Sequence, residues 1–535
     1  MMDPGFSPSS SVMHPAAHTD TTAPALRASA LVFTVLGALL LVLLLLLDTL
    51  APGDRGFLVV TRRNIDSICY FSTAHSLLFD RDFDITNQLA VMIPPEAPLP
   101  RGIRFWVDPV PATGLPGSPY AIGYSLLGIP FLAAGTALDA LAGGRPDGYG
   151  PWAERIFCVA NVFYLVLGLF LLHRWLVSAA VQIELNPASS PRAVTAWALT
   201  ASVALIPATA LGYYAFTVMS HPVSFLSVAL FLYLWWDRRD SLQPRHWLLI
   251  GAAAALMTLC RWQNSLYLVV IAVYELSTPG RLARFSSRTW WWSRAAGAAA
   301  MAVLLVPQFA QWHVVYGSWF TVPQGQGFIE FPPSRILHVL FSSNNGLFFT
   351  TPATLAGFFG LFLGLKRHRP LFAALLAAAA IQIVLIGSLP KYWDGRAFAM
   401  RNLINLLPLV ALGWLFLLLN YGRRARAGVL AWVCLGAAFT LLSAAQWRYE
   451  LVPRHEPLTW DEAVTGKFQI SSALRRAQAI DRAQTSADLE LVRRQHGDSA
   501  ILLRRLKDAY SAEGRPQDAA AIETLLQQRR ARTLF

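Results

Sequence analysis

Asp66 is the residue of this sequence whose type and position best suit proton transfer. It follows the first long apolar run, and the apolar residues after it recur at helical spacing. This spacing predicts an amphipathic helix lying along a membrane, with Asp66 in its first turn. A carboxylate at the edge of a lipid-accessible cavity can act as general base toward a hydroxyl acceptor. The alternative is that Asp66 only caps the helix, because an acidic side chain satisfies free amide groups there.

Three more aspartates, Asp80, Asp82 and Asp84, follow in the sequence FDRDFDIT. Their alternating spacing is compatible with ligation of a divalent cation. We favour a solvated turn that ends the helix, since short acidic turns are usually hydrated. We therefore expect no metal site, with a divalent cation as the less favoured alternative.

Cations that suit a phosphate group lie in two further segments. Arg261 and Asn264 belong to CRWQN, where a guanidinium fork could match phosphate oxygens and neutralise a departing phosphate. The alternative for Arg261 is a snorkelling side chain at the membrane surface. Lys391, Arg396 and Arg401 belong to PKYWDGRAFAMRN. They form either a binding patch for a lipid phosphate or an anchor among lipid headgroups.

Four other polar residues are candidates for accessory roles. His221 begins an apolar segment in VMSHP, where it could carry a proton or contact a phosphate, or could cap and pack instead. His75, Asn344 and Asn345 are expected on the same side of the membrane as Asp66.

Composition places these residues in a polytopic membrane protein. The chain has 535 residues, of which 55% are hydrophobic and 14% charged, and one apolar run reads LVFTVLGALLLVLLLLL. The net charge of +13 comes mostly from short basic clusters between apolar segments, where such clusters set topology. No basic and aromatic surface of the kind that binds nucleic acid is visible, so we expect no nucleic-acid partner.

Apolar length predicts an all-α protein with about 11 transmembrane helices. Residues 246–277 are broken by CRWQN and are expected to form two short helices that meet at a polar turn. The clear spans are residues 28–50, 153–175, 193–215, 219–236, 295–313, 346–365, 370–388, 403–420 and 428–446.

Residues 120–142 are ambiguous, and the positive-inside rule decides them. If they do not cross, the basic clusters near residues 238–245, 281–294, 366–369 and 423–426 all face the cytoplasm. We therefore predict that this segment is an interfacial helix and that the N-terminus is cytoplasmic.

Three domains follow from this topology. Residues 1–27 are expected to be a disordered cytoplasmic tail, and residues 28–447 a transmembrane domain whose first extracytoplasmic loop spans residues 51–152. Residues 448–535 are less apolar and rich in helix formers, which predicts a small extracytoplasmic helical domain. Within it, EGRPQD is expected to separate two helices.

The ordered set of motifs resembles the GT-C superfamily of membrane glycosyltransferases, and more narrowly its bacterial members related to protein O-mannosyltransferases and aminoarabinose transferases. The resemblance covers residues 28–447. It rests on Asp66 followed by SLLFDRDFDITN, and on MSHPVSFLSVALFLYL, CRWQNSLYL, YGSWFTVPQGQGF with LFSSNNGLFFTTP, and WDGRAFAMRNLINLLPL.

The resemblance implies transfer of a sugar from a polyprenyl-phosphate donor to a hydroxyl acceptor on a lipid, glycan or protein. It also implies a bacterial inner membrane, an extracytoplasmic active site and Asp66 as the catalytic residue. The sequence departs from the family's acidic pair, because Ile65 and Ser67 flank Asp66, and from a second acidic residue found in some relatives, because Ser220 and His221 stand there. We therefore expect transfer without a metal ion.

Two other functions stay open on the sequence. A transporter or flippase of a lipid-linked sugar would also need cations at the outer face, but such proteins usually show paired broken helices in two related halves. A scaffold for envelope assembly would use the C-terminal helices, but would need neither Asp66 nor Arg261.

Overall fold

The structure is a computed structural model that describes residues 22–50, 57–58, 65–93, 107–325, 327–393, 397–454 and 456–533. Within these ranges the secondary structure is helical, apart from two isolated β-bridges. The all-α prediction is confirmed for the described residues. α1 begins at Thr22 and not at residue 28, because helix-forming residues extend it beyond the apolar run. Residues 1–21 of the predicted disordered tail lie outside the described residues.

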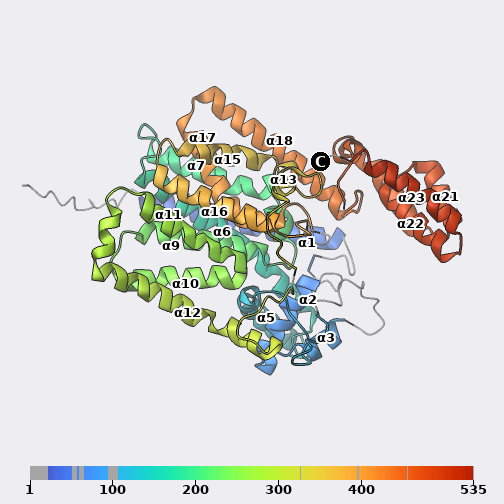
Figure 1. Ribbon diagram of the computed structural model, residues 1–535, viewed down its shortest axis with the longest axis horizontal. Coiled ribbons are helices and arrows are strands. Elements are labelled where there is room, and N and C mark those ends of the chain that lie inside the picture. The colour runs from blue at the N-terminus through green and yellow to red at the C-terminus, as the bar shows by residue number, and fades with distance from the viewer. Residues whose placement is uncertain are drawn as a thin grey trace, which may run out of the picture.

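The apolar body is formed by long helices with short helical turns between them (Figure 1). They are α1 (Thr22–Leu50), α2 (Ile65–His75), η2 (Ser76–Asp80), α3 (Thr86–Met92), α5 (Gly123–Leu141), α6 (Pro151–Gln182), α7 (Pro191–Ala208), α8 (Leu211–Ala215), α9 (His221–Arg238), α10 (Pro244–Cys260), η3 (Trp262–Leu268), α11 (Val269–Ser277), η4 (Arg281–Ser286), α12 (Arg288–Tyr316), α13 (Ile336–Phe341), α14 (Leu347–Thr350), α15 (Ala353–Gly364), α16 (Arg369–Gly387), η5 (Arg401–Leu406), α17 (Leu407–Asn420) and α18 (Arg423–Arg448).

Among the residues that the structure describes, seven helices are long and apolar enough to cross a membrane. Their ranges are Ala28–Thr49, Gly123–Leu141, Pro151–Gln182, Arg288–Tyr316, Arg369–Gly387, Arg401–Asn420 and Arg423–Arg448. Six of them coincide with predicted spans, and the seventh, α5, is the segment that we predicted to stay at the surface. These helices identify the chain as a multi-pass membrane protein.

The helix formed by η5 and α17 lies at the centre of the bundle. Its apolar window is 100% buried, whereas the windows of α1 and α18 are only 17% buried. α17 packs against both α7 and α15. The largely exposed apolar faces of α1, α12 and α18 are therefore the surfaces available to lipid.

Basic loops gather at one end of the bundle. Arg239, after α9, donates a hydrogen bond from Nη1 to Gln182 at the end of α6 (2.7 Å). Arg367, after α15, donates from Nε to the backbone oxygen of Glu184 (3.2 Å). We call this the basic end. The residues that begin α9 and end α10 lie at the opposite end of these helices, and we call that the site end.

The predicted break in residues 246–277 is confirmed. α10 ends at Cys260, Arg261 is extended (φ −159°, ψ 127°), and η3 leads into α11. α10 begins beside Asp240, and Arg281, just after α11, forms an ion pair with the same Asp240. Both helices therefore have their other ends at the basic end, and Arg261 is the tip of the hairpin at the site end.

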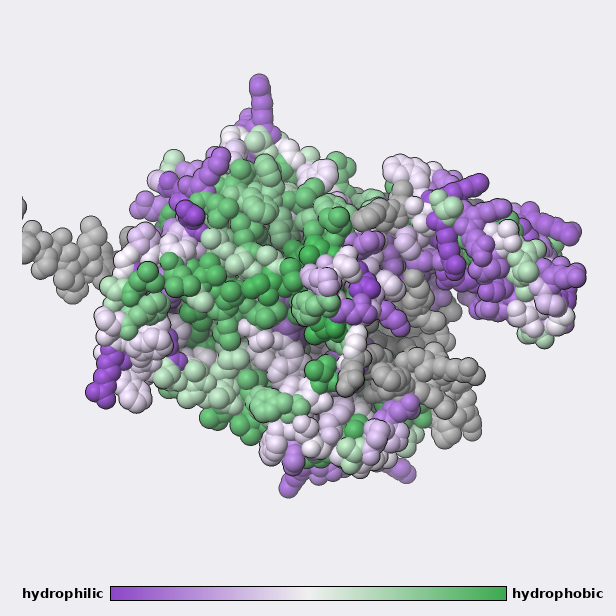
Figure 2. All heavy atoms as spheres, in the orientation of Figure 1, coloured by the Kyte–Doolittle hydropathy of each residue, from purple (hydrophilic) through white to green (hydrophobic). Residues whose placement is uncertain are grey.

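The C-terminal segment forms a small helical unit with its own core. It consists of α19 (Trp460–Ala463), η6 (Thr465–Gln469), α20 (Ile470–Arg482), α21 (Ser486–His496), α22 (Ala500–Ala512) and α23 (Pro516–Arg530). The predicted boundary at EGRPQD is confirmed, because α22 ends just before it and α23 begins within it. Figures 1 and 2 show this unit beside the body, with a mainly hydrophilic surface in contrast to the apolar body.

Lys467 joins the C-terminal unit to the body. Its ammonium group donates a hydrogen bond to Oε1 of Gln446 on α18 (3.0 Å) and lies 4.2 Å from the ring centre of Phe439. Burial lowers the pKa of Lys467 to about 8. A second link is the hydrogen bond from the amide of Leu458 to Oγ of Ser343 (2.9 Å). The contact between the C-terminal unit and the body is therefore made in part by directional hydrogen bonds.

The crossing of α15 and α17 depends on glycine. A Cβ atom on Gly413 would overlap the carbonyl group of Gly357. We expect Gly413→Ala to destabilise the protein by roughly 1–3 kcal/mol, because the two backbones must separate. Gly428→Ala is the matched control, since nothing lies within 4 Å of the corresponding Cβ position. The measurement is thermal unfolding in one detergent, and equal melting temperatures for the two variants would contradict the prediction.

Candidate functional site

Asp66 lies in the first turn of α2 and accepts hydrogen bonds on both carboxylate oxygens. The hydroxyl of Tyr120 donates to Oδ1 (2.5 Å), and Nη1 of Arg401 donates to Oδ2 (3.1 Å). The side chain of Asp66 is 14% exposed and that of Arg401 10%. Ion pairs this far from solvent are weakly screened, so each charge strongly affects the other.

α2 is enclosed by protein on nearly every side. Its residues other than Asp66 are buried. Ser67 donates a hydrogen bond to the backbone oxygen of Val218 (2.8 Å), and Tyr70 donates to Oγ of Ser220 (2.9 Å). The prediction of a helix is therefore confirmed, but the polar face that an amphipathic helix would turn to water is wrong, because both faces of α2 are buried. Polar residues at the positions of Ser67 and Tyr70 form hydrogen bonds to the segment before α9 instead of facing water.

Arg401 begins η5, the turn that leads into the buried helix α17. Nη1 of Arg401 contacts Sδ of Met219 (3.7 Å) in addition to Asp66. The turn that leads into the central helix α17 therefore begins at the residue that pairs with Asp66. This ion pair connects α2 to the central helix.

Arg261 lies in the same network. Its Nη1 donates to Nδ1 of His221 (2.9 Å), and its Nη2 donates to Oδ1 of Asn402 (2.7 Å), the neighbour of Arg401. Since a guanidinium can only donate, Nδ1 of His221 accepts, and we assign the neutral tautomer with hydrogen on Nε2. The imidazole also packs against the ring of Tyr214, with 4.4 Å between ring centres.

Charge in this network favours an anion. Arg401 donates to Asp66, and Arg261 donates to Asn402, the residue that follows Arg401, so two guanidinium groups accompany one carboxylate here. The planar donors of Arg401 and Arg261 are suited to phosphate or carboxylate oxygens. An arrangement of one carboxylate and two arginines can therefore hold an anion beside a proton acceptor.

Asn264 is buried and has hydrogen-bond partners within the helices around it. Its amide nitrogen donates to Oγ of Ser224 (3.0 Å) and to the backbone oxygen of Met257 (2.9 Å), and its oxygen accepts from Asn405 (3.0 Å). The structure therefore gives Asn264 a place beneath Arg261, where it fixes the hairpin tip and does not face the arginine network.

The other predicted phosphate ligands are not joined to this network by the contacts described. Lys391 is exposed. Arg396 lies outside the described residues. Asn345, with backbone φ of 67°, donates to the backbone oxygen of Ala397 (2.9 Å), and Asn344 is buried beside it. Asn345 therefore helps to hold the chain near residue 397 in place.

His75 has a structural environment. Its ring stacks on Tyr149 and Phe79, with ring centres 4.2 and 4.5 Å away, and its Nε2 lies 2.7 Å from the backbone oxygen of Asp147. Burial lowers the pKa of His75. These contacts connect α2 to the loop before α6 and leave no donor aimed at Asp66.

The three later aspartates close turns after α2. Asp80 accepts from Asn87 (3.0 Å) and Gln88, Asp82 accepts from Ser76 (2.7 Å), and Asp84 accepts from the amide of Thr86 (2.9 Å). The hydrogen bond from Asn87 keeps the pKa of Asp80 below its usual value. Among described residues, no group of three His, Cys, Asp or Glu side chains is placed to hold a metal ion.

Tyr120, Tyr70 and Asn402 also belong to the site, although none of them was predicted from the sequence. Burial, followed by the charge of Asp66, raises the pKa of Tyr120 well above its usual value, so this hydroxyl stays protonated and donates. Asn402 directly follows Arg401, and that adjacency was a usable signal. Tyr120 lies far from Asp66 in sequence, and nothing local indicated the contact.

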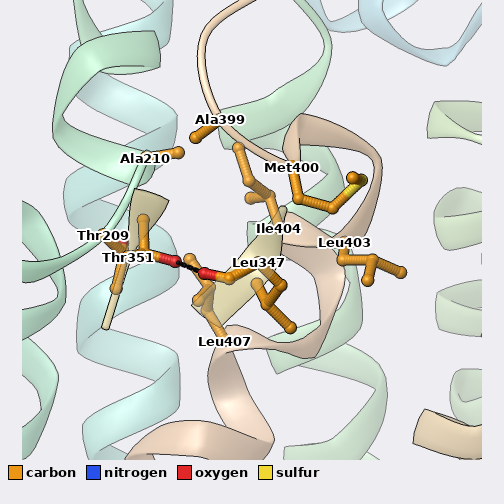
Figure 3. A pocket seen from close by; sticks show the side chains of 9 residues that line it. All are labelled: Thr209, Ala210, Leu347, Thr351, Ala399, Met400, Leu403, Ile404 and Leu407. Atoms are coloured by element: carbon orange, nitrogen blue, oxygen red, sulfur yellow. Dashed lines mark hydrogen bonds between the residues drawn. The ribbon is translucent and has the colours of Figure 1, made fainter. Parts of the chain in front are cut away.

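A small cavity beside η5 does not qualify as a substrate site. It holds about 10 Å³, enough for one water molecule, and is lined mainly by apolar residues such as Met400 and Leu407. Figure 3 shows these side chains, with the hydroxyl of Thr351 donating to the backbone oxygen of Leu347 (2.6 Å). The network around Asp66 is therefore the better candidate.

Comparison with known protein families found no matching family model, and comparisons with curated proteins and with solved structures found no match either.

The ion pair of Asp66 and Arg401 predicts a non-additive mutant cycle. Arg401→Met leaves a buried carboxylate without its cation, which we expect to cost roughly 3–5 kcal/mol. Adding Asp66→Asn removes the orphaned charge, so the double variant should unfold at a higher temperature than Arg401→Met alone. Thermal unfolding of the four proteins in one detergent measures this coupling, and additive losses would show that the pair is not coupled.

Proposed function

We propose that this protein is a membrane glycosyltransferase that moves a sugar from a polyprenyl-phosphate donor to a hydroxyl acceptor. The observation that carries the proposal is the contact between Asp66 and Arg401. Arg261 lies close to this pair, because it donates a hydrogen bond to Asn402, the residue that follows Arg401. General-base transfer from a phosphate donor needs a carboxylate near cations, because the acceptor oxygen that loses its proton attacks the same anomeric carbon from which the phosphate departs.

We further propose eleven membrane crossings, with α5 packed beside the site-end part of the bundle. Two contacts support this placement of α5: the hydroxyl of Tyr164 donates to the backbone oxygen of Leu127 (2.7 Å), and Asp139 accepts from the amide of Trp152 near the start of α6 (3.0 Å). α5 therefore follows only the first part of α6. The positive-inside rule then puts the basic end in the cytoplasm and Asp66 outside.

The contacts also suggest how the donor activates the base. Without donor, Arg401 holds Oδ2 of Asp66. A donor phosphate would compete for the same guanidinium, and Oδ2 would become available to an acceptor hydroxyl. Tyr120 would keep the carboxylate oriented through Oδ1. Substrate binding is thus coupled to the release of the base.

In the proposed step, Asp66 takes the proton of the acceptor hydroxyl. The acceptor oxygen bonds to the anomeric carbon while the bond from that carbon to the phosphate oxygen breaks, with inversion. The phosphate leaves with the electron pair, and Arg261 and Arg401 balance its charge. The neutral His221 keeps Arg261 in place without competing for the anion.

Asp66→Asn should reduce transfer by roughly 10²–10⁴-fold, the usual contribution of a general base. The measurement is release of free polyprenyl phosphate from a labelled polyprenyl-phosphate sugar in membranes. Asp80→Asn is the matched control, because Asp80 belongs to the same segment but bonds only to neighbours after α2 in the contacts described. Wild-type release by Asp66→Asn would rule out the base assignment, and donor translocation without release would favour a flippase.

Arg261→Ala should raise the KM for donor far more than the KM for acceptor, because the proposal assigns this side chain to the phosphate. Initial rates at varied donor and acceptor concentrations separate the two. Arg367→Ala at the basic end is the control. A selective increase in the acceptor KM would reassign Arg261 to the acceptor.

A further inference from the structure

A lateral groove lies between α11 and α12 at the basic end, away from Asp66. α10 forms its floor, since α10 packs along α12 while α11 packs along α16. Its volume is about 460 Å³, within the usual range for small-molecule sites. Ile250 and Ala254 on α10, Ile271 and Leu276 on α11, and Ala298 and Met301 on α12 are among its lining residues.

The walls of the groove suit a hydrocarbon chain. The contributing side chains from all three helices are mostly aliphatic, and Leu276 at its edge is 63% exposed. Gly251 and Gly297 bring the backbones of α10 and α12 into close contact, which deepens the floor.

Polar groups without partners lie within this apolar lining. Glu275 is 3% exposed, and its Oε1 accepts a hydrogen bond from Arg281 (3.1 Å) and lies 3.6 Å from Nη2 of Arg294. Among the described residues, neither Oε2 of Glu275 nor Nε of Arg294 has a hydrogen-bond partner. Both residues line the groove. Buried polar atoms without partners are costly, so a ligand with one donor and one acceptor would be favoured here.

Two tryptophans fix the arginine. The guanidinium of Arg294 lies 4.2 Å from the ring centre of Trp247 and 4.3 Å from that of Trp290. A guanidinium held between two rings loses little further freedom when it binds an anion. Arg294 is thus positioned in advance at the polar end of an apolar groove.

The charges around this end are complementary to an anion. The connected cluster contains four arginines, Arg239, Arg281, Arg284 and Arg294, and two acids, Asp240 and Glu275. Four positive charges less two negative charges leave an excess of two. Basic pockets between transmembrane helices on the cytoplasmic side are typical sites for anionic lipid headgroups.

We propose that this groove binds an anionic glycerophospholipid of the adjacent leaflet. One acyl chain lies along Ile271 and Ala298, the phosphate accepts from Arg294, and a headgroup hydroxyl donates to Oε2 of Glu275. The site is independent of the proposed sugar transfer, since it lies at the opposite end of α10 from Arg261.

The test is native mass spectrometry of the delipidated full chain in detergent, titrated with phosphatidylglycerol. Wild type should bind one phosphatidylglycerol more tightly than phosphatidylcholine. Ala298→Trp should abolish binding because the ring fills the groove. Ala299→Trp is the matched control, since the next residue of α12 is exposed but does not line the groove. Equal binding by these two variants would overturn the proposal.

Arg294→Gln gives a second measurement that does not depend on filling the groove. The substitution removes the positive charge that is proposed to bind the phosphate, while Arg281 continues to pair with Glu275. We therefore expect phosphatidylglycerol to bind roughly tenfold more weakly. Unchanged affinity would overturn the headgroup assignment. Retention of a prenyl phosphate in place of phosphatidylglycerol would also overturn it, because the groove would then belong to the donor site.

Discussion

The ion pair between Asp66 and Arg401 is the interaction on which the arrangement of this protein depends. It connects α2, from the loop after the first span, to η5, which begins the central helix α17. Because both side chains are largely shielded from water, neither can lose its partner without cost. The ion pair therefore fixes the position of α2 relative to η5, the turn through which the chain enters α17.

A second set of contacts fixes Arg261 relative to that pair. The chain turns sharply after α10, and Asn264 anchors the turn below the arginine through three hydrogen bonds. His221 and Asn402 then hold the guanidinium on two sides. The arginines come from segments far apart in sequence, and the carboxylate comes from a third.

The two ends of the bundle differ in what they hold. At the site end, the carboxylate of Asp66 pairs with Arg401, and Arg261 lies nearby. At the basic end, arginines surround acids beside an apolar groove, with a surplus of positive charge. The bundle thus separates the charged residues around Asp66 from those beside the apolar groove.

The sequence by itself determined the helical membrane class, the broken hairpin at Arg261, the helix starting near Asp66 and the helix boundary at EGRPQD. These features are local, because apolar length, turn residues and helix formers act over a few residues. Only the tertiary structure decided that α2 is enclosed, that Tyr120 and Asn402 join the network, and that Asn264 supports the hairpin. Those outcomes depend on contacts between segments far apart in the chain, and no local pattern encodes which of several equivalent polar residues will meet.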